Sequence, residues 1–287
     1  MRDFSGRVAV VTGGASGVGR AIAAKLASEG SRVVIADIDV DSIDNTRSAL
    51  AERGIEVDGM EVDVTRAESV NTLAERVFAA YGNVHLLFNN AGVGIKEAKR
   101  RIWTLPDKDW QWAFAVNVMG VTNGIRAFVP TMLERGEEGH VINTSSGNGG
   151  ISSLPTTPVY ASSKAAVTSL TEVLHYQFLI DGTKLQAHVL FPGPHLVNTN
   201  ILNSDRNRPD VFRIEGQAQV AYVDMKALAE SSGVEFELTE PEEVADMAIE
   251  GIREGRFWIL SKLGKNDERL RTRTRSILER ENPEPPQ

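Results

Sequence analysis

Tyr160 and Lys164 are the residues whose types and spacing best suit chemistry. They stand four positions apart in a stretch, 159–179, whose apolar pattern predicts a helix, so their side chains share one face about one turn apart. An ammonium about 5 Å from a phenol, at an effective dielectric of about 20, favours the phenolate by roughly 3 kcal/mol. This would lower the pKa of Tyr160 from near 10 to about 8, a useful range for a proton shuttle. The pair also fits an ordinary helix with an exposed Lys and a half-buried Tyr.

Short apolar runs alternate along the chain with stretches of helical periodicity, and this alternation predicts an α/β fold. Because the runs are apolar throughout, they indicate parallel strands with helices on both faces. We therefore expect a doubly wound, Rossmann-type parallel sheet of about seven strands in a three-layer sandwich. The predicted strands are 8–11, 32–36, 57–64, 84–88, 140–143, 185–191 and 257–260. One long helix is expected over 107–134.

Residues 1–264 are expected to form a single domain. The alternation weakens at 194–238, and an insertion of this length is typically a lid over a binding site. Thr239, followed three positions later by Glu242, predicts the start of the next helix as a capping box. Residues 265–287 form a charge-dense tail, whose last residues we expect to be mobile.

The composition excludes several classes of function. The 287 residues include no cysteine, which excludes disulfides, thiolate catalysis and cysteine-based metal sites, and we expect no metal. The net charge of −8 argues against a nucleic-acid partner. No apolar run approaches the length of a membrane span, and the chain leads within a few residues into a strand, which leaves no room for a signal peptide. A cytoplasmic location is expected by default.

A glycine-rich turn joins the first predicted strand to the first predicted helix. It reads T-G-G-A-S-G-V-G over 12–19. Glycines let the backbone approach a pyrophosphate closely, and a helix N-terminus offers N–H groups and positive potential. The position directly after a first strand favours dinucleotide binding over the alternative, a tight turn with no ligand.

Asp37 ends the second predicted strand, 18 positions beyond Gly19. A carboxylate there can accept hydrogen bonds from the adenosine ribose hydroxyls. It would repel a 2′-phosphate by roughly 2 kcal/mol, or about thirtyfold, even in water, and Ser16 in the loop supplies no compensating positive charge. NAD is therefore favoured over NADP. Asp63 ends the third strand in the same way and could reach the adenine amino group. Each carboxylate would alternatively cap the turn that follows it.

Together with further motifs, these residues resemble the short-chain dehydrogenase/reductase family over roughly 5–200. Besides the glycine loop and the Y-x-x-x-K pair, the chain carries N-N-A-G at 89–92, the strand I-N-T-S-S at 142–146, and P-G at 192–193. The resemblance implies hydride transfer to or from a nicotinamide without a metal. It also implies the Rossmann-type fold that the alternation predicts.

The resemblance further implies a role for each motif residue. Tyr160 would exchange a proton with the substrate oxygen, and Lys164 would lower its pKa and hold the nicotinamide ribose. Ser146 would hydrogen-bond the substrate oxygen. Asn117 would hold a water that links Lys164 to solvent, although the residue alone also fits a helix Asn bonded to local backbone. The expected cofactor-binding residues are Gly13, Ala15, Ser16, Gly17, Val18, Gly19, Asp37, Ile38, Asp63, Val64, Asn90, Ala91, Gly92, Tyr160, Lys164, Pro192, Gly193, Val197 and Thr199.

Two spacings depart from the family pattern. Ser146 lies one position further from Tyr160 than is usual, and the residue at the usual spacing is Gly147, which has no hydroxyl. We assign the role to Ser146, with Ser145 as the less favoured choice. Two residues are inserted after P-G, and His195 lies in this insertion as either a surface-loop His or a substrate contact.

The substrate is expected to be neutral and fairly bulky, such as an alicyclic, aryl or steroid-like secondary alcohol or ketone. The candidate walls carry apolar and aromatic side chains without concentrated positive charge. The expected substrate contacts are Ser146, Gly147, Tyr160 and His195. Further candidate walls are Gly94, Ile95, Trp103, the stretch 147–158 and the lid.

The favoured function is an NAD-dependent oxidoreductase that interconverts a secondary alcohol and a ketone. An NADPH-dependent ketoreductase of the same fold and a non-catalytic dinucleotide sensor are the alternatives. The resemblance also implies pairing of the helices at 107–134 and 159–180 between subunits. Both segments carry apolar residues all round, so we expect a homotetramer or homodimer.

Overall fold

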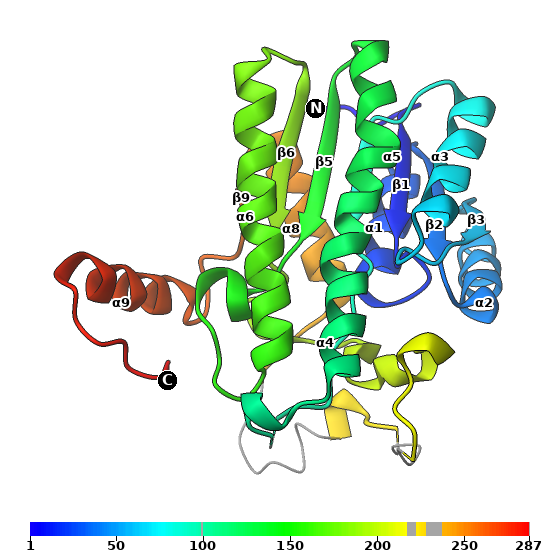
Figure 1. The fold of residues 1–287 in the computed structure, drawn as a ribbon. Helices are drawn as coiled ribbons and strands as arrows, with labels where there is room; N and C mark the ends of the chain where they lie inside the picture. Colours follow the sequence, from blue (N-terminus) through cyan, green and yellow to red (C-terminus); the bar gives the residue numbers. More distant parts are fainter. Residues whose placement is uncertain (99, 217–221, 228–236, 287) are drawn as a thin grey trace.

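The structure, a computed structural model, describes residues 1–287 except 99, 217–221, 228–236 and 287. Its centre is a seven-stranded parallel sheet in the order β3-β2-β1-β4-β5-β6-β9 (Figure 1). The chain starts near the middle of this sheet and winds outward in both directions, as predicted. The strands are β1 Val8–Thr12, β2 Arg32–Asp37, β3 Asp58–Glu61, β4 Leu86–Asn89, β5 Gly139–Thr144, β6 Leu185–Leu190 and β9 Trp258–Ile259.

β3 is shorter than the predicted strand 57–64. It lies at the edge of the sheet and pairs only with β2, whose last residue Asp37 is opposite Glu61. Beyond Glu61 the chain therefore has no partner strand, and the residues from Val62 to Val64 become a loop at the carboxyl end of the sheet.

Helices cover both faces of the sheet (Figure 1). Alternate strand residues face opposite sides, so Val11 and Ile35 pack against α1 and α8, whereas Val10 and Val34 pack against α3 and α5. This arrangement confirms the three-layer sandwich. The helices are α1 Gly17–Ser28, α2 Val40–Ala51, α3 Ala67–Tyr81, α4 Asp107–Phe114, α5 Gly120–Arg135, α6 Pro158–Ile180, α8 Pro241–Arg253 and α9 Asn266–Glu279.

The helix predicted over 107–134 is interrupted. A π-helical turn, Ala115–Met119, separates α4 from α5. A π turn widens the helix and changes which side of it the following residues face, and such turns often occur at functional sites. Asn117 lies in the middle of this turn.

The segment predicted as a lid, which follows β6, contains short regular elements that its weak periodicity did not predict. It contains β7 Leu196–Val197, the 3₁₀ segments η4 Asn200–Asn207 and η5 Asp210–Phe212, and β8 Leu238–Thr239, which pairs with β7. Two parts of the predicted lid, 217–221 with its apolar Val220 and 228–236 with its apolar Leu228, lie outside the described residues.

Helix α8 begins one residue later than predicted. Its N-cap is Glu240, which forms the capping box with Glu243, rather than Thr239 with Glu242. Thr239 belongs to β8, and its hydroxyl accepts a hydrogen bond from the backbone N–H of His195 at 3.0 Å. Because Thr239 is bonded within the two-stranded sheet of β7 and β8, the N-cap of α8 is the next residue, Glu240.

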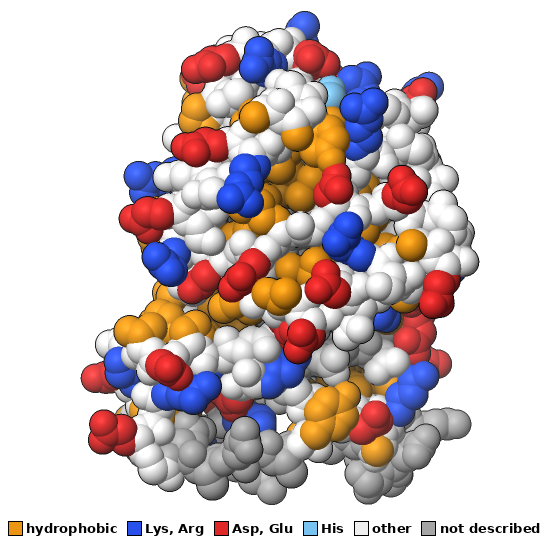
Figure 2. Space-filling view, turned by 90° about the vertical axis from the view of Figure 1, so that its right-hand side faces the viewer, with side chains coloured by type: hydrophobic (Ala, Val, Ile, Leu, Met, Phe, Trp, Pro, Cys, Tyr) orange, Lys and Arg blue, Asp and Glu red, His pale blue; other side chains and the backbone are white. Residues whose placement is uncertain are grey.

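Much of the predicted charged tail is helical. Helix α9 lies to one side of the sheet in Figure 1, and its Arg273 donates a hydrogen bond to the carbonyl oxygen of Ile151 at 2.8 Å. None of the described helices is long and apolar enough to span a membrane. Figure 2 shows acidic and basic side chains intermixed on the face that carries α2 and α3, with neither sign concentrated.

Candidate active site

A cavity of about 460 Å³ opens at the carboxyl ends of the central strands. It is lined by loops that follow β1, β2, β3, β4, β5 and β6, together with part of η4. β1 connects to β2 on one side of it and its other neighbour β4 connects to β5, so the chain leaves these two adjacent strands towards opposite faces of the sheet, to α1 and to α5. Ligands of open α/β sheets bind in the crevice at such a point.

The glycine loop forms one end of the cavity. Gly13 and Gly17 have φ values of 63° and 48°, which favour glycine, and both line the cavity. A Cβ on Gly19 would lie 2.1 Å from the carbonyl oxygen of Gly13, so only glycine allows the helix to start this close to the loop. Ser16, the N-cap residue, makes no side-chain cap bond, and the first turn of α1 has no acidic residue. The start of α1 therefore presents its positive potential to the cavity.

The Asp37 carboxylate faces the cavity beside this loop. It accepts hydrogen bonds from the backbone N–H groups of Ala15 at 3.1 Å and Asp39 at 3.3 Å. Burial raises the pKa of Asp37, and these backbone N–H groups oppose the rise. Asp37 thus both braces the loop and lines the cavity, so the two roles considered from the sequence are compatible.

Asp63 also lines the cavity, but one of its oxygens is committed to the turn that follows. Its Oδ1 accepts hydrogen bonds from the backbone N–H of Thr65 at 2.9 Å and from the Thr65 hydroxyl at 2.7 Å. The alternative of turn capping therefore holds for this oxygen.

Asn90 holds three strand ends together. Its side-chain amide donates to the carbonyl oxygen of Thr12 at 3.2 Å, and its Oδ1 accepts from the Thr144 hydroxyl at 3.3 Å. The Thr12 hydroxyl in turn accepts the backbone N–H groups of Asn90 and Ala91. These bonds fix the ends of β1, β4 and β5 relative to one another, and thereby the wall of the cavity.

Tyr160, Ser146 and Lys164 line the same cavity and lie close together. Tyr160 and Lys164 come from the first two turns of α6, and Ser146 directly follows β5. The Ser146 side chain is hydrogen-bonded to the phenol of Tyr160. Lys164 is 3% exposed, and its Nζ donates to the carbonyl oxygen of Thr144 at 2.9 Å and lies 5.8 Å from the centre of the Tyr160 ring.

Ser145 points away from this group into the protein. Its hydroxyl donates to the carbonyl oxygen of Lys164 at 2.9 Å and lies 2.7 Å from the Thr168 hydroxyl. The choice of Ser146 over Ser145 therefore agrees with the geometry.

The prediction that Lys164 lowers the pKa of Tyr160 to about 8 is wrong for this structure. Burial raises the pKa of Tyr160, and the hydrogen bond with Ser146 only partly opposes the rise. Burial also lowers the pKa of Lys164 from 10.5 to about 8. Loss of solvation therefore outweighs the attraction between an ammonium and a phenolate, a balance that a single effective dielectric does not describe.

The sequence and the fold of the chain both match those of known proteins. A family profile described as short chain dehydrogenase matches residues 7–209. The chain belongs to the short-chain dehydrogenase family. It is 39% identical to a crystal structure of a short-chain dehydrogenase/reductase from Burkholderia phymatum in complex with NAD, with a TM-score of 0.88 and coverage of 100% of this chain and 99% of that one.

Two curated relatives share most of their length with this short-chain dehydrogenase. A "CLA biosynthesis dehydrogenase/reductase" of Lactiplantibacillus plantarum is 28% identical over 264 residues, which are 91% of this chain and 90% of the relative. A "C alpha-dehydrogenase" of a Sphingobium species is 29% identical over 261 residues, which are 91% of this chain and 82% of the relative.

The cavity brings together most of the residues that the sequence singled out in this short-chain dehydrogenase. Those that line it are Gly13, Ser16, Gly17, Val18, Asp37, Ile38, Asp63, Val64, Asn90, Ala91, Gly92, Gly94, Ile95, Ser145, Ser146, Tyr160, Lys164, Pro192, His195, Val197 and Thr199. Those that are not among its lining residues are Ala15, Gly19, Trp103, Asn117, Gly147 and Gly193.

Gly147 and Trp103, both predicted near the substrate, do not line the cavity. A Cβ on Gly147 would lie 2.9 Å from Oδ1 of Asn266, so this glycine faces the start of α9 and not the predicted substrate region. Trp103 is 79% exposed to solvent and is not among the residues that line the cavity. His195 does line the cavity, and its Nε2 is also 2.8 Å from a carboxylate oxygen of Glu237.

Asn117 is fully buried behind the cavity wall. Its Oδ1 accepts the backbone N–H of Val93 at 2.8 Å, and its Nδ2 donates to the Val93 carbonyl oxygen at 3.1 Å and to the Ser163 hydroxyl at 2.9 Å. A Cβ on Gly92 would lie 3.3 Å from Lys164 Nζ and 3.4 Å from Asn117 Oδ1. The Asn117 side chain thus holds the chain after β4 close to Lys164, and it bonds to distant rather than local backbone.

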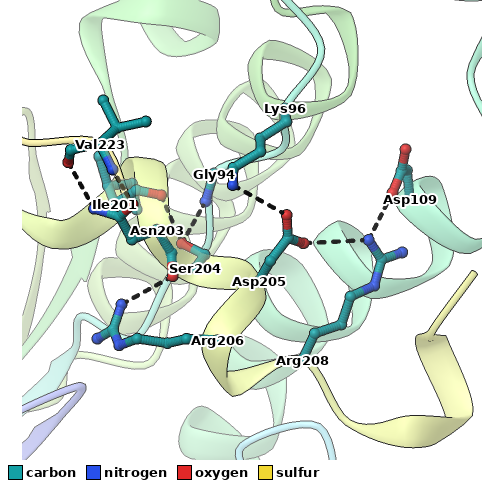
Figure 3. A network of polar contacts seen from close by, with 10 residues as sticks. All are labelled: Gly94, Lys96, Asp109, Ile201, Asn203, Ser204, Asp205, Arg206, Arg208 and Val223. Atoms are coloured by element: carbon teal, nitrogen blue, oxygen red, sulfur yellow. Dashed lines mark hydrogen bonds and ion pairs between the residues drawn. The ribbon is translucent and has the colours of Figure 1, made fainter. Parts of the chain in front are cut away.

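Trp112, from α4, lines the cavity and had no signal in the sequence. Leu202 and Arg206 come from η4, inside the predicted lid, but the sequence singled out neither of them. Figure 3 shows η4 tied to the loop after β4, where the Gly94 N–H donates to Ser204 Oγ at 3.1 Å. Their positions depend on tertiary contacts of an irregular segment, which no periodicity reveals.

The residues present fit a nicotinamide dinucleotide. The glycine loop and the open start of α1 suit a diphosphate, and Asp37 has oxygens at the place where a ribose would present hydroxyls. Gly92 leaves room beside Lys164 that any Cβ would fill. Tyr160, Ser146 and Lys164 (the Tyr160 group) line the same cavity, so a dinucleotide and a small substrate can occupy it together.

Proposed function

We propose that this chain is an NAD-dependent oxidoreductase that interconverts a secondary alcohol and a ketone. The observation that carries the proposal is a shared cavity: Tyr160, Ser146 and Lys164 line the same space as the glycine loop and Asp37. Membership of the short-chain dehydrogenase family supports oxidoreductase chemistry in general. The reaction direction, the cofactor and the substrate class are the further parts of the proposal.

A bound nicotinamide dinucleotide would supply the hydride acceptor or donor. In alcohol oxidation the Tyr160 phenolate accepts the hydroxyl proton, and in ketone reduction the Tyr160 phenol donates a proton to the carbonyl oxygen. The Ser146 hydroxyl, already bonded to the phenol, orients the substrate oxygen. Lys164, held by the Thr144 carbonyl oxygen, places its ammonium beside the ring and favours the phenolate.

The ionisation of Tyr160 sets a direction for the pH dependence. Because burial raises its pKa, the neutral phenol dominates near pH 7, which is the form that ketone reduction needs. Alcohol oxidation needs the phenolate, so its rate should increase as the pH rises. A reductive rate that increased with pH would contradict Tyr160 as the proton donor.

NAD is favoured because the Asp37 carboxylate lies where an adenosine 2′-phosphate would have to fit. The solved relative from Burkholderia phymatum was obtained in complex with NAD, which supports the same choice here. One observation favours NADP instead: Arg206 lines the cavity, and its positive charge contributes to lowering the pKa of Asp39. Separate titrations of NAD and NADP distinguish the two, and a higher kcat/KM for NADP would reverse the preference.

The substrate is proposed to be a neutral, bulky secondary alcohol or ketone. Ile95, Trp112, Leu154 and Leu202 line the cavity along with the Tyr160 group, so much of its wall is apolar. Such a wall favours an alicyclic or aromatic carbon skeleton and offers no cluster of positive charge to a phosphate ester.

The experiment is a panel of secondary alcohols and ketones, assayed with NAD(H) by the absorbance of the reduced cofactor. We expect turnover of bulky neutral compounds by the wild type and a loss of at least about 100-fold in Tyr160→Phe, as general acid–base catalysis contributes on this scale. Preference for small polyols or acyl thioesters would overturn the substrate class. Full biological function of Tyr160→Phe would favour the non-catalytic dinucleotide sensor.

We also propose that the protein forms a homotetramer or homodimer through α5 and α6. These helices lie side by side in Figure 1, and α6 exposes Val173, Tyr176, Leu179 and Ile180, the last at 82%. Exposed apolar groups on neighbouring turns of one helix are typical of an interface. Light scattering that gave a monomer mass at micromolar concentration would refute the pairing.

A further inference from the structure

Helix α6 carries Tyr160 and Lys164, yet its own sequence does not cap its N-terminus. The N-cap residue Thr157 makes no side-chain bond to the helix, and the first turn has no acidic residue. The Thr157 hydroxyl instead accepts a hydrogen bond from the side chain of Asn148 at 2.7 Å. The first N–H groups of a helix have no partner within it, so those of α6 need one from elsewhere.

That partner is Glu97, from the loop after β4. Its Oε2 accepts the backbone N–H of Val159 at 2.8 Å, and its Oε1 accepts the backbone N–H of Tyr160 at 3.0 Å. Glu97 is 0% exposed and lies 62 positions before Val159 in the chain. A buried carboxylate that accepts two N–H groups at the positive end of a helix makes strong, directional bonds.

The charges around Glu97 connect it to η4 and the residues after it. Burial raises the pKa of Glu97, the Asp109 carboxylate adds to the rise, and the two N–H groups of α6 oppose it. Asp109 is itself paired with Arg208 at 2.8 Å and with Arg100 at 3.6 Å. Figure 3 shows Arg208, which follows η4, reaching Asp109 on α4. Within the described residues, which omit Lys99, no basic side chain forms an ion pair with Glu97.

We propose that Glu97 is a positioning residue for the proton shuttle: its ionised carboxylate holds the first turn of α6 and so fixes the Tyr160 hydroxyl relative to Ser146 and to the substrate oxygen. The inference rests on the proposed role of Tyr160. One of the two bonds is made by the backbone of Tyr160 itself, so movement of this turn moves the phenol directly. A displacement of about 1 Å at a reacting group can reduce a rate by about 100-fold.

Glu97→Gln is the primary variant. Its amide group keeps the size of the side chain but can accept at only one of the two positions, and its NH₂ would face an N–H donor. We expect kcat for the alcohol selected by the panel to fall between about 10- and 100-fold, while the Kd for NAD stays within about twofold, because the glycine loop and Asp37 belong to other elements. Glu243→Gln is the matched control, since it removes a capping carboxylate from α8, far from Tyr160, and should leave kcat unchanged.

The pH profile distinguishes positioning from a general loss of structure. In the wild type, kcat for reduction of the corresponding ketone, which uses the neutral phenol of Tyr160, should fall in acid as Glu97 is protonated, with a midpoint above the usual value for a glutamic acid because burial raises its pKa. In Glu97→Gln this acidic fall should be absent. A variant that kept kcat within twofold of the wild type, or that kept the same acidic fall, would overturn the proposal.

A measurement without turnover separates this proposal from the proposed function. The chain has four tyrosines, so ¹³C-tyrosine NMR with Tyr160→Phe as the assignment variant can follow Tyr160 alone. With Glu97 intact, the Tyr160 signal should shift in the acidic range, where a phenol does not itself ionise. The experiment is done in a His195→Gln background, since His195 also lines the cavity and is ionisable. No acidic shift would refute the role of Glu97 even if the enzyme proved inactive on every alcohol or if Glu97→Gln did not fold.

Discussion

Lys164→Met should reveal how much folded-state stability the buried ammonium removes. Lys164 is 3% exposed, and burial lowers its pKa from 10.5 to about 8. A pKa difference of about 2.5 units, at about 1.4 kcal/mol per unit, corresponds to about 3 kcal/mol of unfavourable burial while the group is charged in both states. At neutral pH the buried charge of Lys164 therefore lowers the free energy of unfolding by this amount, while it places an ammonium beside Tyr160.

The sign of the pH dependence follows from the two pKa values. The folded pKa lies below the unfolded one, so the unfolded state binds more protons between pH 8 and 10.5, and the free energy of unfolding of the wild type rises through this window. The linkage relation gives a rise of about 2 kcal/mol between pH 7 and pH 9.5 from this group. Methionine has no such dependence, so the stability of Lys164→Met relative to the wild type should fall by the same amount.

The assay is urea unfolding followed by tryptophan fluorescence at fixed protein concentration and several pH values. Loss of the bond to the Thr144 carbonyl oxygen costs about 1 kcal/mol at every pH, so the test is the pH dependence and not the absolute difference. Lys184→Met, at an exposed position before β6, is the control. If Lys164→Met and the wild type differed in free energy of unfolding by the same amount at pH 7 and at pH 9.5, burial of the Lys164 charge would not be the origin of that difference.

Three further predictions follow from the charged and apolar groups. Asp37→Asn should reduce the preference for NAD over NADP by up to about thirtyfold, measured as the ratio of kcat/KM values, because it removes the repulsion of a 2′-phosphate. Arg208→Met should lower the free energy of unfolding by about 3 kcal/mol, since it leaves the buried Asp109 without its closest partner. The same change at the partly exposed Lys25, which pairs with Asp246, should cost at most about 1 kcal/mol in urea unfolding. Ile180→Glu should shift light-scattering masses towards the monomer, and an unchanged mass would exclude this part of α6 from the interface.

The sheet and the end of the cavity formed by the glycine loop and Asp37 were predictable because local chemistry determines them. Apolar runs bounded by glycine or a carboxylate specify buried parallel strands, and a glycine loop needs the φ values seen at Gly13 and Gly17 wherever it occurs. Asp37 lies at the end of β2, which brings it to the same edge of the sheet as that loop. Such features are encoded within a few residues of each other.

Residues that act through distant contacts left no such signal. Glu97 is a single Glu in an irregular stretch, and its role exists only because α6 begins beside it. Arg206 and Arg208 fall in the segment predicted as a lid, but its polar sequence does not mark which residues face inward; Arg208 is 5% exposed, and its guanidinium carbon lies 4.7 Å from the centre of the Trp112 ring. The π turn at Asn117 likewise has no marker in the helical periodicity. Sequence patterns describe elements, whereas these roles arise where elements meet.

The ionisation of Tyr160 and Lys164 shows that reasoning from sequence is limited in the same way when it estimates energies. From sequence, Tyr160 and Lys164 interact across one helical turn at an assumed dielectric, and attraction is the only contribution. In the folded protein the β5 strand end and the chain after β4 enclose Lys164, so desolvation acts on both groups and opposes both charges. The hydrogen bond with Ser146 opposes the rise in the Tyr160 pKa, and Lys164 Nζ donates to the Thr144 carbonyl oxygen, so both side chains depend on contacts outside α6. Accordingly, a residue that fixes the start of α6, as we propose for Glu97, should influence proton transfer as strongly as one that changes the charge of the pair.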